Sequence, residues 1–221
     1  MDSLFERWRS TYTDEDKFIC DGIINEDKWS RATDRVLFLL KELNLAPGSW
    51  SASQPFEVQR DFRKTVDERP WKEIGQWAYA ILHRREKPRF ADADAVANYE
   101  QACRSIAIVN CKKTAGSNSS SFSEIKKYAI RDKEFINAQI QLIDPSIIVC
   151  CGKNTSFQLA KKLFQDANDA KLHYQSTAND LSGRIWKGSR YWWVDYVHPS
   201  MRVGTRKRKY DGLLELATQI P

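Results

Sequence analysis

Four short, largely apolar runs, each followed by a polar or turn residue, constrain the fold of this chain most. They occupy residues 35–40, 105–109, 146–151 and 191–197. Runs of this length and composition are typical of strands that are buried on both faces of a parallel sheet. Segments with helical spacing separate them. Strand alternating with helix predicts an α/β protein, a three-layer α/β/α sandwich around a central, mostly parallel four-stranded sheet.

The predicted helices lie between and after these strands. Residues 56–69 and 71–84 show helical spacing, and a helix is expected to follow Gly152. A capping box of Ser121 and Glu124 predicts a helix that stops before the Asp144–Pro145 pair. A last helix is predicted over residues 210–218 or so. We expect one domain over residues 1–221, with a helical N-terminal extension up to residue 34 and a core from 35 to 217.

The composition favours an acidic partner and excludes several kinds of site. Lys and Arg number 35 against 29 Asp and Glu, so the net charge is +6 and the pI is about 9.0. Such an excess favours a polyanion such as nucleic acid. The 5 cysteines form no CxxC pair, which argues against a disulfide framework or a metal site. With no apolar signal core and no membrane-length apolar run, we expect a cytoplasmic protein without a membrane partner.

Each of the four predicted strands brings a chemically useful residue to its carboxyl end. Glu42, Asn110, Gly152 and His198 would gather along one rim of a parallel sheet, where such sheets place their chemistry. Each residue also has a structural interpretation: a surface charge, a turn residue, a glycine at a helix entry and a hydrogen-bonded histidine before a turn. Their shared placement at strand ends favours a functional site.

The order of these segments resembles the uracil-DNA glycosylase superfamily. Residues 36–42 resemble the first motif, which holds the catalytic water, and residues 106–113 resemble the middle motif, whose asparagine reads the base edge. Residues 145–152 are similar to the strand–glycine–helix element, and residues 198–202 to the His-Pro-Ser loop. The resemblance covers roughly residues 35–217, and its nearest branch has an Asn-x-x-Lys middle motif, here Asn110 and Lys113.

Two departures from that branch bear on function. Many of its members bind an iron–sulfur cluster, but this chain lacks the cysteine spacing, so no cofactor and no metal are expected. The first motif usually has a glycine before its polar residues and a proline after them. Here Leu40 or Lys41 and Leu43 or Asn44 stand in those places, which leaves the register of Glu42 open by one position.

The resemblance implies a role for each candidate residue. His198 would donate a hydrogen bond to a base carbonyl and stabilise the departing base, and Glu42 would orient water and stabilise the sugar cation. Asn110 offers a donor and an acceptor to the edge of a pyrimidine. Phe56 resembles the aromatic residue that stacks on a flipped base, with Trp50 as a second candidate. Phe56 is equally well interpreted as the first core residue of a helix.

Contacts to DNA are assigned to the region after His198 and to the middle motif. Met201 would wedge into the gap that the flipped base leaves, and the basic residues would bind phosphates. A basic run of this kind is also typical of a solvated face. The predicted DNA-contacting residues are Lys113, Ser200, Met201, Arg202, Arg206, Lys207 and Arg208, with Lys209 in the same run.

Three functions are compatible with these patterns. The first is a monomeric, monofunctional DNA glycosylase that flips out uracil or another altered base, in single- or double-stranded DNA, and hydrolyses its N-glycosidic bond. In a bacterium it would be associated with the nucleoid. The second is a catalytically inactive nucleic-acid-binding module of the same fold, which the altered first motif favours. The third is an enzyme that acts on free nucleosides, and the basic run argues against it.

Overall fold

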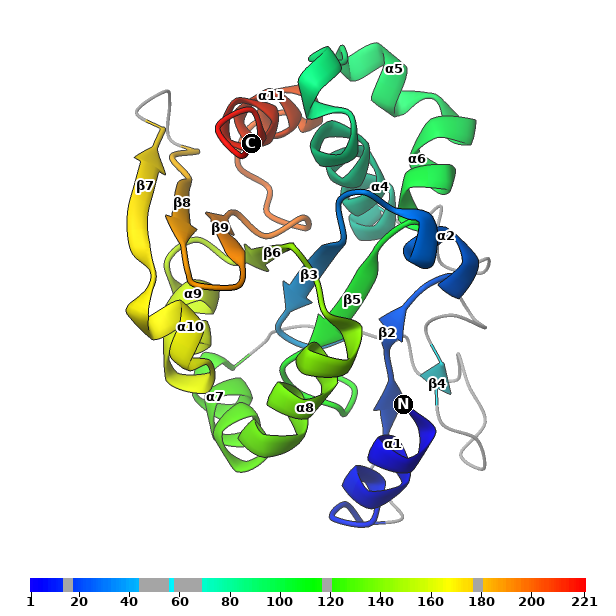
Figure 1. Ribbon diagram of the computed structural model, residues 1–221, viewed down its shortest axis with the longest axis vertical. Coiled ribbons are helices and arrows are strands. Elements are labelled where there is room, and N and C mark those ends of the chain that lie inside the picture. The colour runs from blue at the N-terminus through cyan, green and yellow to red at the C-terminus, as the bar shows by residue number, and fades with distance from the viewer. Residues whose placement is uncertain (14–17, 44–55, 58–68, 117–120, 177–180) are drawn as a thin grey trace.

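The computed structural model describes residues 1–13, 18–43, 56–57, 69–116, 121–176 and 181–221. Within these residues a seven-stranded mixed sheet has helices on both of its faces (Figure 1). The predicted α/β class is confirmed. The predicted four-stranded sheet is wrong in size, because three antiparallel strands extend it at its two edges.

The four apolar runs form the parallel centre of the sheet. In spatial order they are β5 (Ala107–Asn110), β3 (Val36–Leu40), β6 (Ile147–Cys151) and β9 (Trp192–Tyr196). Every residue of β3, β5 and β6 is buried, as their continuous apolar character predicts. Leu40 lies opposite Asn110, and Cys151 lies opposite Tyr196, so the four carboxyl ends share one rim.

The strands that the sequence did not predict lie outside this centre. β2 (Gly22–Ile23) pairs with β5 at one edge, and β8 (Arg184–Lys187) and β7 (Lys171–Gln175) extend the sheet beyond β9. β1 (Ile19–Cys20) and β4 (Phe56–Glu57) pair in parallel and form a separate two-stranded sheet. The two-residue strands carry no periodicity to detect, and β7 is mostly exposed, so its residues lack an apolar run.

Two of the sequence predictions are corrected by these strands. The N-terminal extension, expected to be helical, supplies β1 and β2 as well as helices. Phe56 belongs to β4 and pairs with Ile19, so a helix does not begin there.

Helices cover both faces of the sheet (Figure 1). One face carries α4 (Arg69–Leu82), α5 (Phe90–Asp94), α6 (Val96–Cys103) and α11 (Arg206–Ala217). The other carries α1 (Asp2–Arg9), α7 (Phe122–Arg131), α8 (Lys133–Ile143), α9 (Thr155–Leu163) and α10 (Gln165–Asp169). The short helix α2 (Glu26–Arg31) precedes β3, and a 3₁₀ turn, η1 (Arg84–Glu86), follows α4. Among the described residues, every helix is too short or too polar to cross a bilayer.

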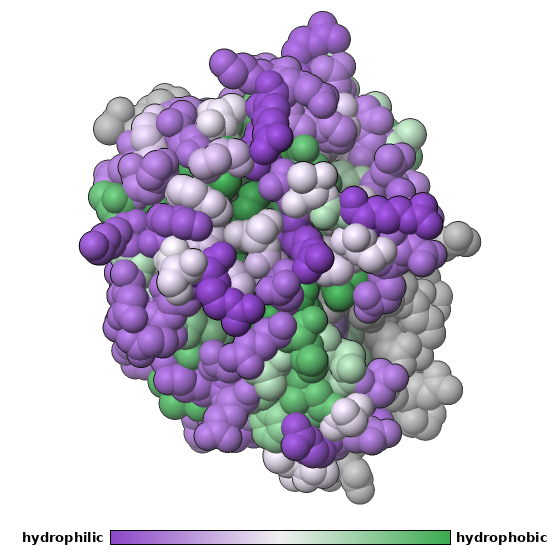
Figure 2. Space-filling view, viewed as in Figure 1, coloured by the Kyte–Doolittle hydropathy of each residue, from purple (hydrophilic) through white to green (hydrophobic). Residues whose placement is uncertain are grey.

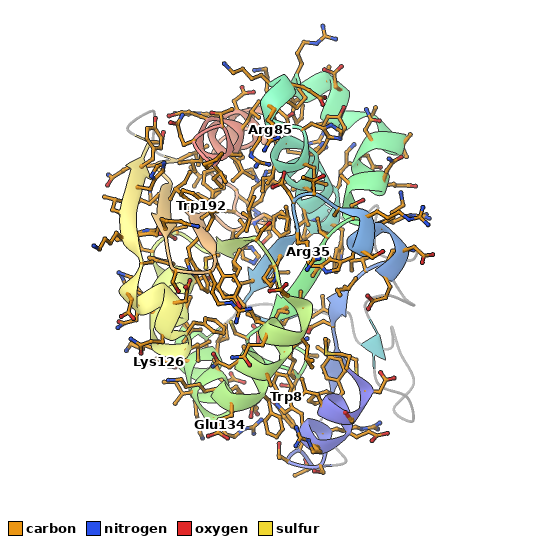
Figure 3. The ribbon with its side chains drawn as sticks, viewed as in Figure 1. Trp8, Arg35, Arg85, Lys126, Glu134 and Trp192 are labelled. Atoms are coloured by element: carbon orange, nitrogen blue, oxygen red, sulfur yellow. The ribbon has the colours of Figure 1, made fainter. Side chains whose placement is uncertain are left out.

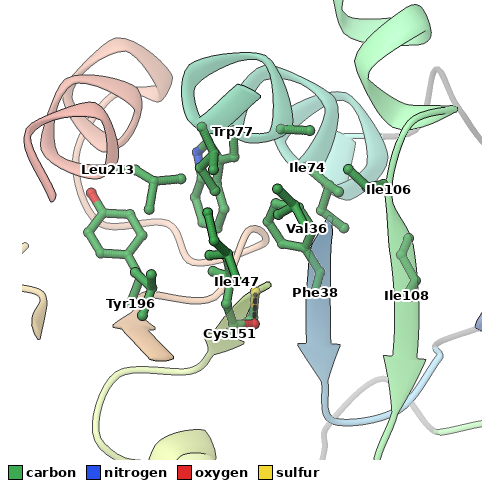
Figure 4. Packing of buried hydrophobic residues seen from close by; sticks show 14 of the residues in the cluster. Val36, Phe38, Ile74, Trp77, Ile106, Ile108, Ile147, Cys151, Tyr196 and Leu213 are labelled. Carbon is green, nitrogen blue, oxygen red and sulfur yellow. Dashed lines mark hydrogen bonds between the residues drawn. The ribbon is translucent and has the colours of Figure 1, made fainter. Parts of the chain in front are cut away.

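Each helical layer has its own apolar core. Figure 4 shows the core beneath α4 and α11, where Trp77 meets Tyr196 edge-on with ring centroids 5.4 Å apart. On the opposite face Trp8, labelled in Figure 3, is completely buried and stacks on Phe135 of α8 at 5.4 Å. In Figure 2 hydrophilic residues dominate the surface, and hydrophobic ones gather over α8, where Leu142 is 59% exposed.

Two predicted helices have different limits in the structure. The helix expected after Ser121 is divided at Asp132, whose buried carboxylate accepts hydrogen bonds from Arg131 and from Tyr12. The last helix begins at Arg206, a turn earlier than predicted, because the Thr205 hydroxyl caps it by accepting from the Arg208 amide at 3.1 Å.

Candidate functional site

A cavity of about 420 Å³ lies at the carboxyl ends of β3, β6 and β9. It is lined by Lys41, Gly152, Lys153, Thr155, His198, Ser200 and Met201. The predicted convergence of strand ends is therefore present for Gly152 and His198. Glu42 and Asn110 are not part of this lining. Lysines 41 and 153 make the cavity basic, which suits an anionic or electron-rich ligand.

His198 is held in one hydrogen-bonding state. The Ser200 amide donates to its Nδ1 at 3.2 Å, and the Ser200 hydroxyl lies 2.7 Å from the same nitrogen. A backbone N–H can only donate, so Nδ1 is the acceptor and the neutral ring carries its proton on Nε2. Burial, reinforced by the charges of Lys41 and Lys209, lowers the pKa of His198 to about 4. At neutral pH the ring is therefore an uncharged donor through Nε2.

Gly152 allows Lys41 to reach the cavity. Its φ of +146° lies in a region that side chains rarely adopt. A Cβ atom there would lie 2.6 Å from the Ser156 hydroxyl oxygen and 3.0 Å from Cε of Lys41. The Gly152 amide also donates to the carbonyl oxygen of Tyr196 at 2.8 Å, which joins the end of β6 to the end of β9. The glycine thus has a steric role at the wall of the cavity.

The turn after Gly152 is held by a buried carboxylate. Asn154 has a φ of 64°, its amide donates to Oδ1 of Asp195 at 3.1 Å, and its side-chain oxygen accepts from Arg184 at 2.8 Å. Burial raises the pKa of Asp195 to about 6, against the opposing effects of the Asn154 amide and nearby cations. Asp195 therefore fixes the turn that contributes Lys153 and Thr155 to the cavity.

Glu42 is enclosed beside the cavity region rather than within its lining. Its side chain is 4% exposed, and Oε2 lies 3.1 Å from Nζ of Lys112, which also contacts Glu124 of α7 at 2.7 Å. A Cβ on Gly116 would lie 2.3 Å from the Glu42 carboxyl carbon, so the chain closes directly over this group. Oε1 is buried and has no hydrogen-bond partner among the described residues. Oε2 is thus paired with Lys112, and Oε1 can still accept a hydrogen bond.

Asn110 is bound to a residue that the sequence interpretation missed. The carboxylate of Asp21 accepts from the Asn110 amide at 2.8 Å and from its side-chain Nδ2 at 3.0 Å. Gln139 of α8 donates to the same carboxylate at 2.9 Å, and all three side chains are fully buried. Asn110 Oδ1 is left without a partner in the described part of the chain. A single aspartate inside the apolar segment 18–24 is the signal that could have identified this buried acid.

Lys113 faces inward, which corrects its predicted placement at a DNA-binding surface. Its ammonium group is fully buried, forms an ion pair with Asp21 and lies 4.9 Å from the centre of the Trp8 ring. The cause is Asp21, whose buried charge requires a cation. In this arrangement Lys113 supports Asn110 through Asp21 and does not reach a phosphate.

The other predicted DNA contacts differ in their exposure to solvent. Ser200, Arg202 and Arg208 are exposed, and Met201 is half-buried against the core. Arg206 lies 3.3 Å from Asp94, and Lys207 lies 2.6 Å from Asp211. Lys209 is completely buried beneath the His198 turn and is not a surface cation. Trp50 and the side chain of Phe56 fall outside the described residues.

Asn110 ends β5, and His198 follows β9 by two residues, with two other strands between β5 and β9. In the order β5-β3-β6-β9 their strands are three spacings of about 4.8 Å apart, or about 14 Å. Asn110 is also fully buried and does not line the cavity, so the two residues do not share it.

Comparisons of the chain with protein-family models, with curated proteins and with solved structures find no match. Function is therefore inferred from the geometry of the site. Within the described residues no three His, Cys, Asp or Glu side chains are grouped so that they could hold a metal ion.

Proposed function

We propose that this chain is a DNA glycosylase that hydrolyses the N-glycosidic bond of uracil or another altered base. The observation that carries this proposal is the state of His198. With Nδ1 occupied by the Ser200 amide and a pKa of about 4, the imidazole is a neutral Nε2–H donor in a basic cavity. Such a donor suits the negative charge that develops on a leaving base.

The proposed reaction is the addition of water across the bond between the sugar C1′ and the base nitrogen. As that bond breaks, its electron pair leaves with the base, and the His198 Nε2–H donates to a carbonyl oxygen of the departing anion. Water forms the new bond to C1′, and its proton is finally taken up by the base. Because the imidazole is neutral and Lys41 and Lys153 are cationic, the cavity stabilises the leaving group electrostatically.

Glu42 and Asn110 have the free acceptors that the remaining tasks require. Glu42 follows Lys41 directly in the chain. Its unpartnered Oε1 would accept a hydrogen bond from the attacking water. The unpartnered Oδ1 of Asn110 would accept from a ring N–H of the base. A buried acceptor without a partner costs free energy in the free protein, so a substrate N–H that fills it would be favoured. Neither group lines the cavity, and Asn110 is fully buried, so the base would have to enter beyond the lining to reach them.

A second candidate function is a DNA-binding module without catalysis. It is favoured by the ion pair between Glu42 and Lys112 and by a cavity lining that, among the described residues, has no carboxylate. Such a module would bind DNA through the same basic cavity and leave every base in place.

A glycosylase assay distinguishes the two functions. Single- and double-stranded oligonucleotides with uracil, hypoxanthine, xanthine or modified pyrimidines are incubated with the protein, and alkali reveals abasic sites. We expect cleavage at one altered base and a loss of about 10²–10³ in rate for His198→Ala. Asn110→Ala should also abolish excision. Binding without any abasic product would favour the module, and full activity in both variants would contradict the proposed site.

A further inference from the structure

The turn that carries His198 is anchored from inside the protein. The Met201 amide donates to the carbonyl oxygen of His198 at 2.9 Å, which closes the turn. Beneath it, Nζ of Lys209 donates to the carbonyl oxygen of Pro199 at 3.0 Å and to that of Met201 at 3.1 Å. Both carbonyls belong to the turn itself, so the ammonium group bridges its two sides.

Lys209 is itself held by an acid from another helix. It stands in the first turn of α11, is completely buried, and forms an ion pair with Glu73 of α4, which is 1% exposed. An ammonium group that has left water requires both a counter-charge and hydrogen-bond acceptors. Glu73 provides the charge, and the turn provides the acceptors. The position of the turn is therefore tied to a buried ion pair between α4 and α11.

We propose that Lys209, held by Glu73, is a positioning residue for His198, which fixes the 198–201 turn so that the imidazole presents Nε2–H to the cavity. The chain of contacts is continuous. Lys209 fixes Pro199 and Met201, the residues on either side of Ser200, and the Ser200 amide in turn donates to Nδ1 of His198. If the turn were displaced, the Ser200 amide would no longer donate to Nδ1, and the imidazole could carry its proton on either nitrogen.

The same ammonium group acts on the charge of the imidazole. Among the described residues, the charged groups around His198 are Lys41 at the end of β3, Lys153 before α9 and Lys209 of α11, with Glu73 behind Lys209. Lys41 and Lys209 add to the effect of burial in lowering the pKa of His198. Lys209 thus adds to the effect of burial in keeping the ring neutral, besides holding the turn in place. The consequence for catalysis rests on the function proposed above, whereas the effect on the imidazole does not.

Two double variants separate the two effects. Glu73→Gln with Lys209→Met removes the charge and both hydrogen bonds to the turn, and it avoids an unpaired buried carboxylate. Glu73→Gln with Lys209→Gln also removes the charge but keeps an N–H donor for a turn carbonyl. A matched control is Asp34→Asn with Arg84→Met. It removes another ion pair, in which Nη1 of Arg84 lies 2.6 Å from Oδ2 of Asp34 and the arginine is 1% exposed. Asp34 lies just before β3, at the opposite end of the sheet from His198.

The decisive measurement is an NMR titration of the imidazoles, with ¹⁵N shifts that report which ring nitrogen carries the proton. The chain has only 3 histidines, so His198 can be assigned by one substitution. We expect wild-type His198 to stay neutral to about pH 4 as the Nε2–H form. Both double variants should raise its pKa, although burial, the largest cause of the lowered pKa, stays, and the Met variant should also mix the tautomers. The control variant should change neither.

Catalysis provides a second readout. If the wild type excises a base, the Met variant should lower kcat by about 10–100-fold with little change in KM, and should move the acid limb of its pH profile upward. The Gln variant should recover part of kcat. An unchanged His198 pKa and tautomer in the Met variant would overturn the proposal. So would an equal change in the control. If the Met variant does not fold, the pKa of His198 in the Gln variant decides. If the wild type excises no base, the glycosylase proposal fails and the titration alone still decides the role of Lys209.

Discussion

Asp195 and His198 make opposite contributions to stability over the same range of pH. The pKa of Asp195 rises from 3.8 to about 6 on folding, so its favourable contribution is complete below pH 3.8 and is lost as the pH rises to 6. The pKa of His198 falls from 6.5 to about 4, so its favourable contribution is complete above pH 6.5 and is lost as the pH falls to 4. Between pH 4 and 6 the two slopes have opposite signs and nearly cancel.

Removing either group exposes the slope of the other. Each group changes the free energy of unfolding by at most about 1.4 kcal/mol per pH unit, which over two units gives about 2–3 kcal/mol. His198 is half-buried, so its share should be at the lower end. Relative to the wild type, Asp195→Asn should gain stability as the pH rises from 4 to 6. His198→Gln should lose stability over the same range.

Urea unfolding of the three proteins at half-unit steps from pH 4 to 6.5 tests these slopes. For each variant, the difference in the free energy of unfolding from the wild type is compared, because the contributions of the remaining carboxylates then cancel. In Asp195→Asn the side-chain oxygen still accepts from the Asn154 amide, so a constant offset between the curves is acceptable. Two parallel curves for Asp195→Asn and the wild type would refute the raised pKa. A His198→Gln curve that runs parallel to the wild type would refute the lowered one.

Three further outcomes follow from contacts around the site. Gly152→Ala should lower the free energy of unfolding in urea by about 1–3 kcal/mol more than Gly204→Ala, because only the first places its Cβ against Ser156. Equal losses of stability in the two variants would show that this crowding is unimportant. Lys113→Met should destabilise the fold by about 3–5 kcal/mol by leaving a buried carboxylate unpaired, and Asp21→Asn in the same chain should restore most of it; no recovery would contradict the ion pair. Arg202→Ala should weaken binding to duplex DNA and lower its slope against log salt by about 0.9, as measured by fluorescence anisotropy; an unchanged slope would remove Arg202 from the interface.

The parallel centre of the fold was predictable because burial on both faces leaves a strong pattern. Residues 36–40 and 147–151 have no charged or strongly polar side chain at any position, and both segments form fully buried strands. The edge strands carry no such pattern. In β7, Lys171, Leu172 and His173 are all exposed, so the segment forms a strand through pairing with β8 and not through its own periodicity.

The site was predictable in part. The rule that parallel strands place their ends on one rim correctly brought Gly152 and His198 to one cavity. It could not give the direction of the side chains of Glu42 and Asn110, because each responds to a partner that is distant in sequence. Glu42 forms an ion pair with Lys112, and Asn110 donates a hydrogen bond to Asp21, 89 residues away in the sequence.

The two buried lysines show why a cationic motif is a poor guide to a binding surface. Lys113 and Lys209 each occur in a basic stretch of sequence, yet each is completely buried against an acid, Asp21 or Glu73. A buried ammonium group is tolerated only where its counter-charge and acceptors are fixed, and for the same reason it fixes the backbone that supplies them. In this chain one of them supports Asn110 and the other supports the His198 turn. The positive charges of Lys113 and Lys209 therefore hold the interior in place, and a basic motif in the sequence does not by itself identify a binding surface.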